Sequence, residues 1–174
     1  MSRDSAPETD AHIPDAPSGT PPRLVLDTNI VLDCFVFRDR AAHHLTTAIE
    51  TRRAQALVHQ HAIDELERVL SYPQCRLAAV EQRRILDRYL AAAILAPMPD
   101  GFSREEWLLP AGFPRCRDRD DQPFLALAYH ARADALITKD RALLKLRRKA
   151  RRFGVAIVPP LDLELPRCHD MIPG

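Results

Sequence analysis

The chain has 174 residues, enough for one domain with a buried core, and 46% of them are hydrophobic, as in ordinary globular proteins. Its longest apolar run, Tyr89 to Ala96, is far shorter than a membrane span of ~20 residues, and the N-terminus has no basic-then-apolar signal pattern, so we expect a cytoplasmic protein without a membrane partner. The net charge of +1 hides an asymmetry, because residues 141–152 hold seven cations and no acid, which leaves 18 basic against 24 acidic residues elsewhere.

Composition divides the chain into three parts. Residues 1–22 contain five prolines and only isolated apolar residues, so they predict a disordered leader. Residues 23–165 form the predicted domain, and residues 166–174 form a C-terminal tail. Four widely spaced cysteines without a C-x-x-C pair indicate small buried residues in a reducing compartment rather than a zinc site or a disulfide framework.

Hydrophobic patterning predicts strands that alternate with helices. The predicted strands are residues 24–26, 54–59, 134–138 and 155–158. The predicted helices are residues 40–53, 63–70, 77–95 and 122–132, and one that begins near Arg141. Residues 96–116, with four prolines and two glycines, predict a long loop or lid. This alternation predicts an α/β fold with a doubly wound parallel sheet of about four to five strands and helices on both faces. In such sheets, ligands bind beyond the carboxyl ends of the strands.

Acidic residues follow the predicted strands at this edge. Asp27 directly follows the first strand and Asp140 follows the third, so parallel strands place both on the same edge. Glu65 comes just after the second strand, in the first turn of its predicted helix. Asp121 begins the helix of residues 122–132, above the apolar face that packs on the sheet, and Asp118 lies a turn or less upstream.

Each acid also has a structural interpretation. Asp118 or Asp121 could cap a helix, Asp140 could be the N-cap of the basic helix, and Glu65 could be a solvated surface residue. Several acids that converge on one edge would raise each other's pKa and destabilise the fold unless a cation lies among them. Oxygen ligands without His or Cys favour Mg²⁺ or Mn²⁺, and a pair of such ions suits displacement at phosphorus.

Four segments of the chain resemble the PIN domain, a family of metal-dependent ribonucleases that includes the toxins of many bacterial toxin–antitoxin pairs. The segments are LVLDTN, HAIDELERVL, RDRDDQPFLALAYHARADALITKD and LLKL, and the resemblance extends over residues 23–160. It implies an endoribonuclease that hydrolyses RNA with a metal-activated water, with Mg²⁺ or Mn²⁺ as cofactor. It also implies RNA as substrate, a cognate antitoxin protein as partner and, as in many similar toxins, a homodimer.

The resemblance also implies roles for individual residues. The four catalytic and metal-binding acids correspond to Asp27, Glu65, Asp121 and Asp140, with Asp118 as an alternative or additional ligand. Polar residues that hold the acids in place correspond to Thr28, Asn29 and Thr138. Lys139 stands where this subfamily usually has glycine, and it either contacts substrate phosphate or points outward.

The basic helix predicts a phosphate-binding face, because its cations begin one residue after a proposed metal ligand. The predicted face consists of Arg141, Lys145, Arg148 and Arg152. A solvated charged face is the alternative.

Trp107 and Phe113 could stack on bases or anchor the long loop, and we favour anchoring. His59 and His61 share a strand face, but no third soft ligand accompanies them.

Two other functions compete with the nuclease hypothesis. An aspartyl-nucleophile phosphatase would need a second Asp two residues after Asp27, where this chain has Asn29. A non-catalytic RNA-binding module could keep the fold, although the four acids favour catalysis.

Overall fold

The structure is a computed structural model that describes residues 20–97 and 108–165. The predicted tail, almost all of the predicted leader and Trp107 lie outside the described residues. Five parallel strands form one sheet in the order β3-β2-β1-β4-β5. These strands are β1 (Arg23–Leu26), β2 (Gln55–Val58), β3 (Ala93–Leu95), β4 (Ala135–Ile137) and β5 (Ile157–Val158).

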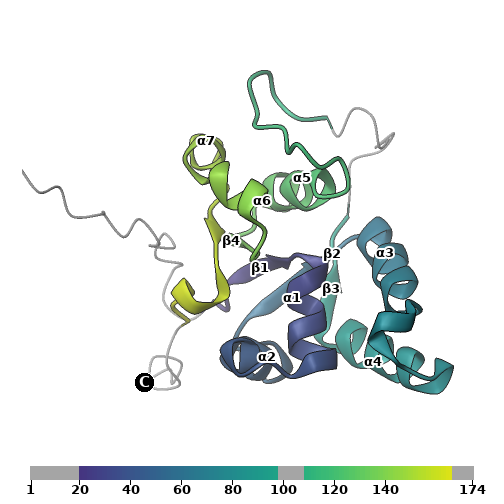
Figure 1. Ribbon diagram of the computed structural model, residues 1–174. Coiled ribbons are helices and arrows are strands. Elements are labelled where there is room, and N and C mark those ends of the chain that lie inside the picture. Colours follow the sequence, from purple (N-terminus) through teal and green to yellow (C-terminus); the bar gives the residue numbers. More distant parts are fainter. Residues whose placement is uncertain (1–19, 98–107, 166–174) are drawn as a thin grey trace, which may run out of the picture.

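Helices cover both faces of the sheet, which confirms the predicted α/β fold (Figure 1). The helices α5, α6 and α7 lie on one side, whereas α1 and α2 lie on the other. The α-helices are α1 (Thr28–Leu32), α2 (His43–Glu50), α3 (Gln60–Leu70), α4 (Ala79–Ala92), α5 (Gln122–His130), α6 (Arg141–Lys145) and α7 (Arg147–Arg151). Short helical turns are η1 (Asp33–Phe37), η2 (Arg40–Ala42), η3 (Pro73–Cys75) and η4 (Pro160–Asp162). Within the described part of the chain, no helix has the length and apolar character that crossing a membrane requires.

The strand order places a topological switch point between β1 and β4. From β1 the chain builds outward through β2 and β3, and it then returns to the other side of β1 with β4 and β5. The chain therefore leaves β1 toward β2 and leaves β4 in the opposite direction, toward β5. The loops that follow these two strands diverge at their carboxyl ends. Open α/β sheets bind ligands at this kind of position. We call the region after Leu26 and Ile137 the carboxyl edge.

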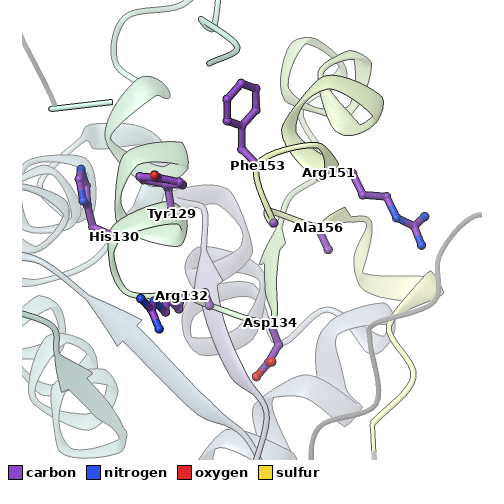
Figure 2. Close-up of a pocket in the computed structure, with 9 residues that line it drawn as sticks. Tyr129, His130, Arg132, Asp134, Arg151, Phe153 and Ala156 are labelled. Carbon is purple, nitrogen blue, oxygen red and sulfur yellow. The ribbon is translucent and has the colours of Figure 1, made fainter. Parts of the chain in front are cut away.

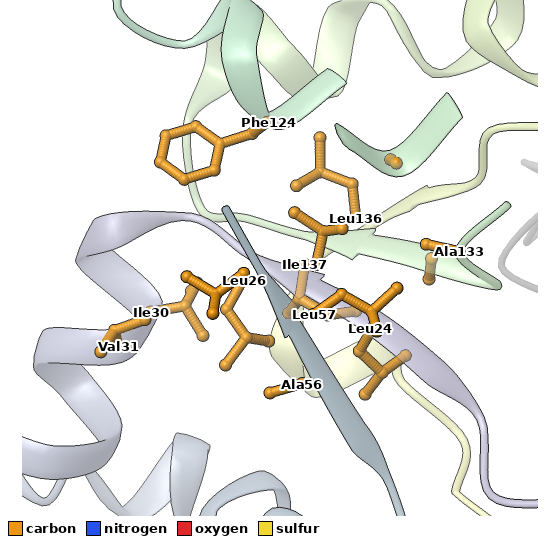
Figure 3. Packing of buried hydrophobic residues seen from close by; sticks show 14 of the residues in the cluster. Leu24, Leu26, Ile30, Val31, Ala56, Leu57, Phe124, Ala133, Leu136 and Ile137 are labelled. Carbon is orange, nitrogen blue, oxygen red and sulfur yellow. The ribbon is translucent and has the colours of Figure 1, made fainter. Parts of the chain in front are cut away.

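The core lies where the central strands meet α1 and α5. Leu24, Leu136 and Ile137 have no exposed surface, and Ile30 of α1 is equally buried (Figure 3). Strands β1 and β4 read as continuous apolar runs because both faces of a parallel sheet are covered by helices. This packing gives the carboxyl edge a rigid support.

Four details differ from the sequence-based prediction. The helix predicted over residues 77–95 ends at Ala92, and its last three residues form β3, because pairing with β2 overrides their helical spacing. Helix α3 begins at Gln60, so Glu65 lies in its second turn rather than its first. The predicted basic helix is interrupted at Leu146 and forms α6 and α7. A helix after β1, α1, was not predicted at all.

Candidate active site

Asp27 is the centre of the carboxyl edge and is almost completely buried, with 3% of its surface exposed. It caps α1, because its Oδ1 accepts a hydrogen bond from the backbone N–H of Asn29 at 2.7 Å. Its Oδ2 accepts a hydrogen bond from the Thr138 hydroxyl at 2.5 Å. Burial raises the pKa of Asp27, Asp140 and Asp33 raise it further, and the two hydrogen bonds oppose the increase.

Thr138 joins the ends of the two central strands. Its fully buried hydroxyl donates to Asp27 and accepts a hydrogen bond from the backbone N–H of Asp140 at 2.9 Å. Asp140 in turn uses Oδ1 to accept the N–H groups of Ala142 and Leu143 at the start of α6. Asp140 is therefore an N-cap, as one interpretation predicted, while its Oδ2 has no hydrogen bond to any described residue. A cap role and a ligand role are compatible in this carboxylate, since each needs one oxygen.

Asp121 lies at the start of α5 but does not cap it with its side chain. Its Oδ2 instead contacts the Cys116 thiol, with 3.7 Å between oxygen and sulfur. Partial burial raises the pKa of Asp121 to about 6, and the charges of Asp27, Asp140 and Asp118 contribute in that order. These influences show that Asp121 shares one electrostatic environment with the strand-end acids.

Glu65 reaches the same region from α3. Its Oε2 is buried and has no hydrogen-bond partner among the described residues, which is unusual for a carboxylate oxygen. Burial raises its pKa, the charge of Arg68 opposes this increase, and the charges of Asp120, Asp27 and Asp121 add to it. A buried carboxylate oxygen without a donor is suited to a cation.

The arrangement fits a hard divalent ion. The four acids Asp27, Glu65, Asp121 and Asp140 offer only oxygen ligands, as Mg²⁺ and Mn²⁺ prefer. Within residues 20–97 and 108–165, however, no three His, Cys, Asp or Glu side chains stand in a closed metal-binding cluster. The acids thus share an edge and an electrostatic environment, but their side chains do not already converge on one point.

The remaining predicted site residues lie in different settings. The backbone of Asn29 supports Asp27 while its side chain is exposed, and Thr28 is buried but forms no side-chain hydrogen bond with any described acid. Asp118 is exposed, and its Oδ1 accepts the N–H of Asp120. His59, at the end of β2, caps α3 by accepting the N–H of Ala62 with Nδ1.

Lys139 neither contacts the four acids nor simply points outward. Its Nζ forms ion pairs with Asp33 at 2.6 Å and Asp39 at 2.9 Å, and these partners raise its pKa. Asp33, which the sequence analysis missed, thereby belongs to the charge network around Asp27. Asp33 lies where α1 ends and η1 begins, and α1 was not predicted from the sequence. Cys116 was also missed as a neighbour of Asp121.

The predicted basic face lies beside the site on α6 and α7. Its members are exposed: Arg141, Lys145, Arg148 and Arg152. Apolar residues of the same segment are turned inward: Leu143 and Ala150 have no exposed surface, and Leu146 and Phe153 are partly buried.

Comparison with known proteins identifies the family of this domain. A family model described as PIN domain matches residues 23–142, well over half of the chain and including all four acids. The matched region ends before residue 160, where the resemblance seen in the sequence ended. A search of the curated proteins found no match. The chain therefore belongs to the PIN-domain family, whose members are generally nucleases that use divalent metal ions.

Proposed function

We propose that the chain is a Mg²⁺- or Mn²⁺-dependent endoribonuclease that hydrolyses RNA phosphodiester bonds. The observation that carries the proposal is the buried, unpartnered Oε2 of Glu65, which lies in one electrostatic environment with Asp27 and Asp121. Desolvated acids that raise each other's pKa are a cost to the apo protein, and a bound cation removes that cost.

The four acids have distinct tasks in this proposal. Asp27 is held by the Thr138 hydroxyl and the Asn29 amide, so its orientation is set before any ligand arrives. Asp140 is held through Oδ1 and presents Oδ2, whereas Glu65 and Asp121 complete the oxygen ligands. A bound Mg²⁺ or Mn²⁺ ion would supply activation of the attacking water and stabilisation of the leaving oxygen. The pKa of Asp121, raised to about 6 in the chain alone, would fall when a cation binds beside this carboxylate.

RNA is positioned in this proposal by the basic face of α6 and α7. Arg141 begins α6 directly after Asp140, so phosphates bound along the face lead to the four acids. Contacts of this kind give affinity without base preference. Lys139 is the cation beside the edge, and RNA phosphate would compete with Asp33 and Asp39 for it. The proposal also includes Asp118 as an additional ligand of the metal ion.

The biological role we propose is that of a cytoplasmic toxin with a cognate antitoxin protein and a homodimeric state. Its support is the likeness of RDRDDQPFLALAYHARADALITKD to the PIN-domain family, which includes the toxins of many bacterial toxin–antitoxin pairs. Expression of the parent chain should arrest growth, while the Asp27→Asn variant should not. Co-expression of a short reading frame adjoining the gene should relieve the arrest.

The decisive experiment is incubation of the purified chain with labelled RNA and DNA in Mg²⁺, in Mn²⁺ and in chelator. We expect internal cleavage of RNA with either ion and none in chelator. RNA binding without cleavage under all three conditions would instead support a non-catalytic RNA-binding module. The surface variant Asp87→Asn is a suitable control, since Asp87 is exposed and pairs only with Arg83 among the described residues.

A further inference from the structure

A recess lies at the edge of the sheet opposite the four acids. It has a volume of about 680 Å³, which is within the range of ligand-binding pockets. Its floor is the segment between α5 and β4, and its walls are the end of α5 and the turn after α7 (Figure 2). The lining residues that carry the argument are Tyr129, Arg132, Asp134, Arg151 and Phe153.

Two aromatic rings form the walls of this recess. Tyr129 projects from α5 and Phe153 from the turn after α7, and both are partly exposed (Figure 2). Buried Phe113 packs against both rings, with centroid distances of 5.3 Å to Tyr129 and 5.1 Å to Phe153. Phe113 therefore anchors the long loop, as we favoured from the sequence, and it also holds the two rings in place. Rings fixed in advance lose little entropy when a planar base packs on them.

Charged groups complete the recess. Arg132 is exposed at its floor and forms no ion pair with another residue of the described chain, and Arg151 lines the opposite wall. Asp134 lies beside Arg132 and uses Oδ2 to accept the backbone N–H of Arg23 at 2.6 Å. Guanidinium groups suit a phosphate, while a carboxylate suits a hydroxyl or amine donor. Aromatic rings, cations and one acid together match the three parts of a nucleotide.

The recess adjoins the C-terminal end of the basic face, because Arg151 and Phe153, the residues on either side of Arg152, line it. This face begins at Arg141 beside Asp140 and ends at Arg152, the residue before Phe153. Asp134 and Asp140 lie before and after β4, and six residues of fully extended chain span at most roughly 20 Å. A single strand that follows α6 and α7 can therefore lie in both places at once.

We propose that this recess is a second RNA-binding subsite, which takes one nucleotide of the single-stranded substrate at a distance from the cleavage site. The proposal rests on the proposed ribonuclease function for its substrate, but it concerns binding rather than catalysis. A base would pack against Tyr129 and Phe153, a phosphate would contact Arg132, and a ribose hydroxyl or base amine would donate to Asp134.

The test is RNA binding in chelator, measured by fluorescence anisotropy with single-stranded oligonucleotides of about four and about sixteen nucleotides. Phe153→Leu keeps the apolar packing on Phe113 but removes the aromatic ring. Arg132→Asn removes the charge at a residue with φ of 48°, a left-handed conformation that asparagine tolerates. Arg52→Asn is the matched control, because Arg52 is also an exposed arginine that follows a helix, with φ of 59°. Thermal melts verify that all three variants fold.

We expect the parent chain to bind the long RNA more tightly than the short one. Phe153→Leu should reduce the ratio of long-RNA to short-RNA affinity by roughly fivefold. This is the low end of the range for losing one base–aromatic stacking contact, because leucine still offers an apolar surface. Arg132→Asn should flatten the salt dependence by about one phosphate contact, and Arg52→Asn should change neither quantity. Cross-linking of 5-bromouridine-substituted RNA should modify Tyr129 or Phe153.

Unchanged affinity for the long RNA in both recess variants would overturn the subsite and leave the recess to another ligand, such as a protein segment. If the parent still cleaves RNA with Mn²⁺ in that case, the proposed function stands while the subsite fails. If no cleavage occurs with either ion but the recess variants lose the length-dependent gain, the subsite stands while the proposed catalysis fails.

Discussion

Replacing Asp121 with asparagine removes one negative charge from the candidate active site and keeps the shape of the side chain. The pKa of Asp121 in the folded protein is about 6, raised from 3.8 by burial and by the neighbouring carboxylates. Because the folded pKa lies above the unfolded value, the parent chain loses stability as pH rises from about 4 to about 6, and it does not regain it above that range. The asparagine variant has no such loss.

The size of this effect follows from the pKa. A change from 3.8 to about 6 corresponds to about 3 kcal/mol of unfolding free energy. Asp121 is only half-buried, so solvent screening reduces this to about 1–1.5 kcal/mol. In a chain of this size, 1 kcal/mol changes Tm by about 2–4 °C. We therefore expect Asp121→Asn in chelator to melt about 2–6 °C above the parent near neutral pH, and to melt close to the parent near pH 4.

The assay is a series of thermal melts across this pH range, in chelator and with Mn²⁺. Mn²⁺ should stabilise the parent by mass action and the variant much less. Asp134→Asn is the matched control, since Asp134 accepts a backbone N–H at the opposite edge of the sheet. The Asp134→Asn variant should gain as much in Tm from Mn²⁺ as the parent does. A variant Asp121→Asn that melts below the parent near neutral pH, or gains as much from Mn²⁺, would refute the reasoning.

Three further predictions concern the same site and its basic face. Asp27→Asn should abolish cleavage with the fold intact and melt no lower than the parent in chelator, whereas a purely structural Asp27 predicts a loss of ~1–3 kcal/mol with or without metal. Glu65→Gln should weaken Mn²⁺ binding measured by calorimetry, and an unchanged Mn²⁺ affinity would remove Glu65 from the site. Lys145 and Arg148 changed together to alanine should weaken RNA binding for all sequences and flatten its salt dependence, and an unchanged salt slope would mean that the face is only solvated.

The sequence alone predicted that Asp27 and Asp140 lie together at the carboxyl edge. Asp27 and Asp140 come just after apolar runs that are long enough only for short buried strands, and parallel strands end on the same side. The helical spacing that follows Asp121 placed this acid above the apolar face of α5, and it is partly buried at the start of that helix. These inferences succeeded because strand ends and helix faces depend on local periodicity, which a single chain displays directly.

Only the tertiary structure decided the features that depend on partners distant in sequence. Ala93–Leu95 pairs with β2 despite a helical pattern, and the strand order that makes β1 and β4 neighbours has no local signal. Tertiary folding also brings Lys139 to Asp33 and Asp39, and it leaves Glu65 with an unpartnered buried oxygen. Strand pairing and side-chain burial depend on which surfaces meet in space. A contact involves two segments, and the periodicity of one segment does not identify the other, so local sequence patterns cannot specify these features.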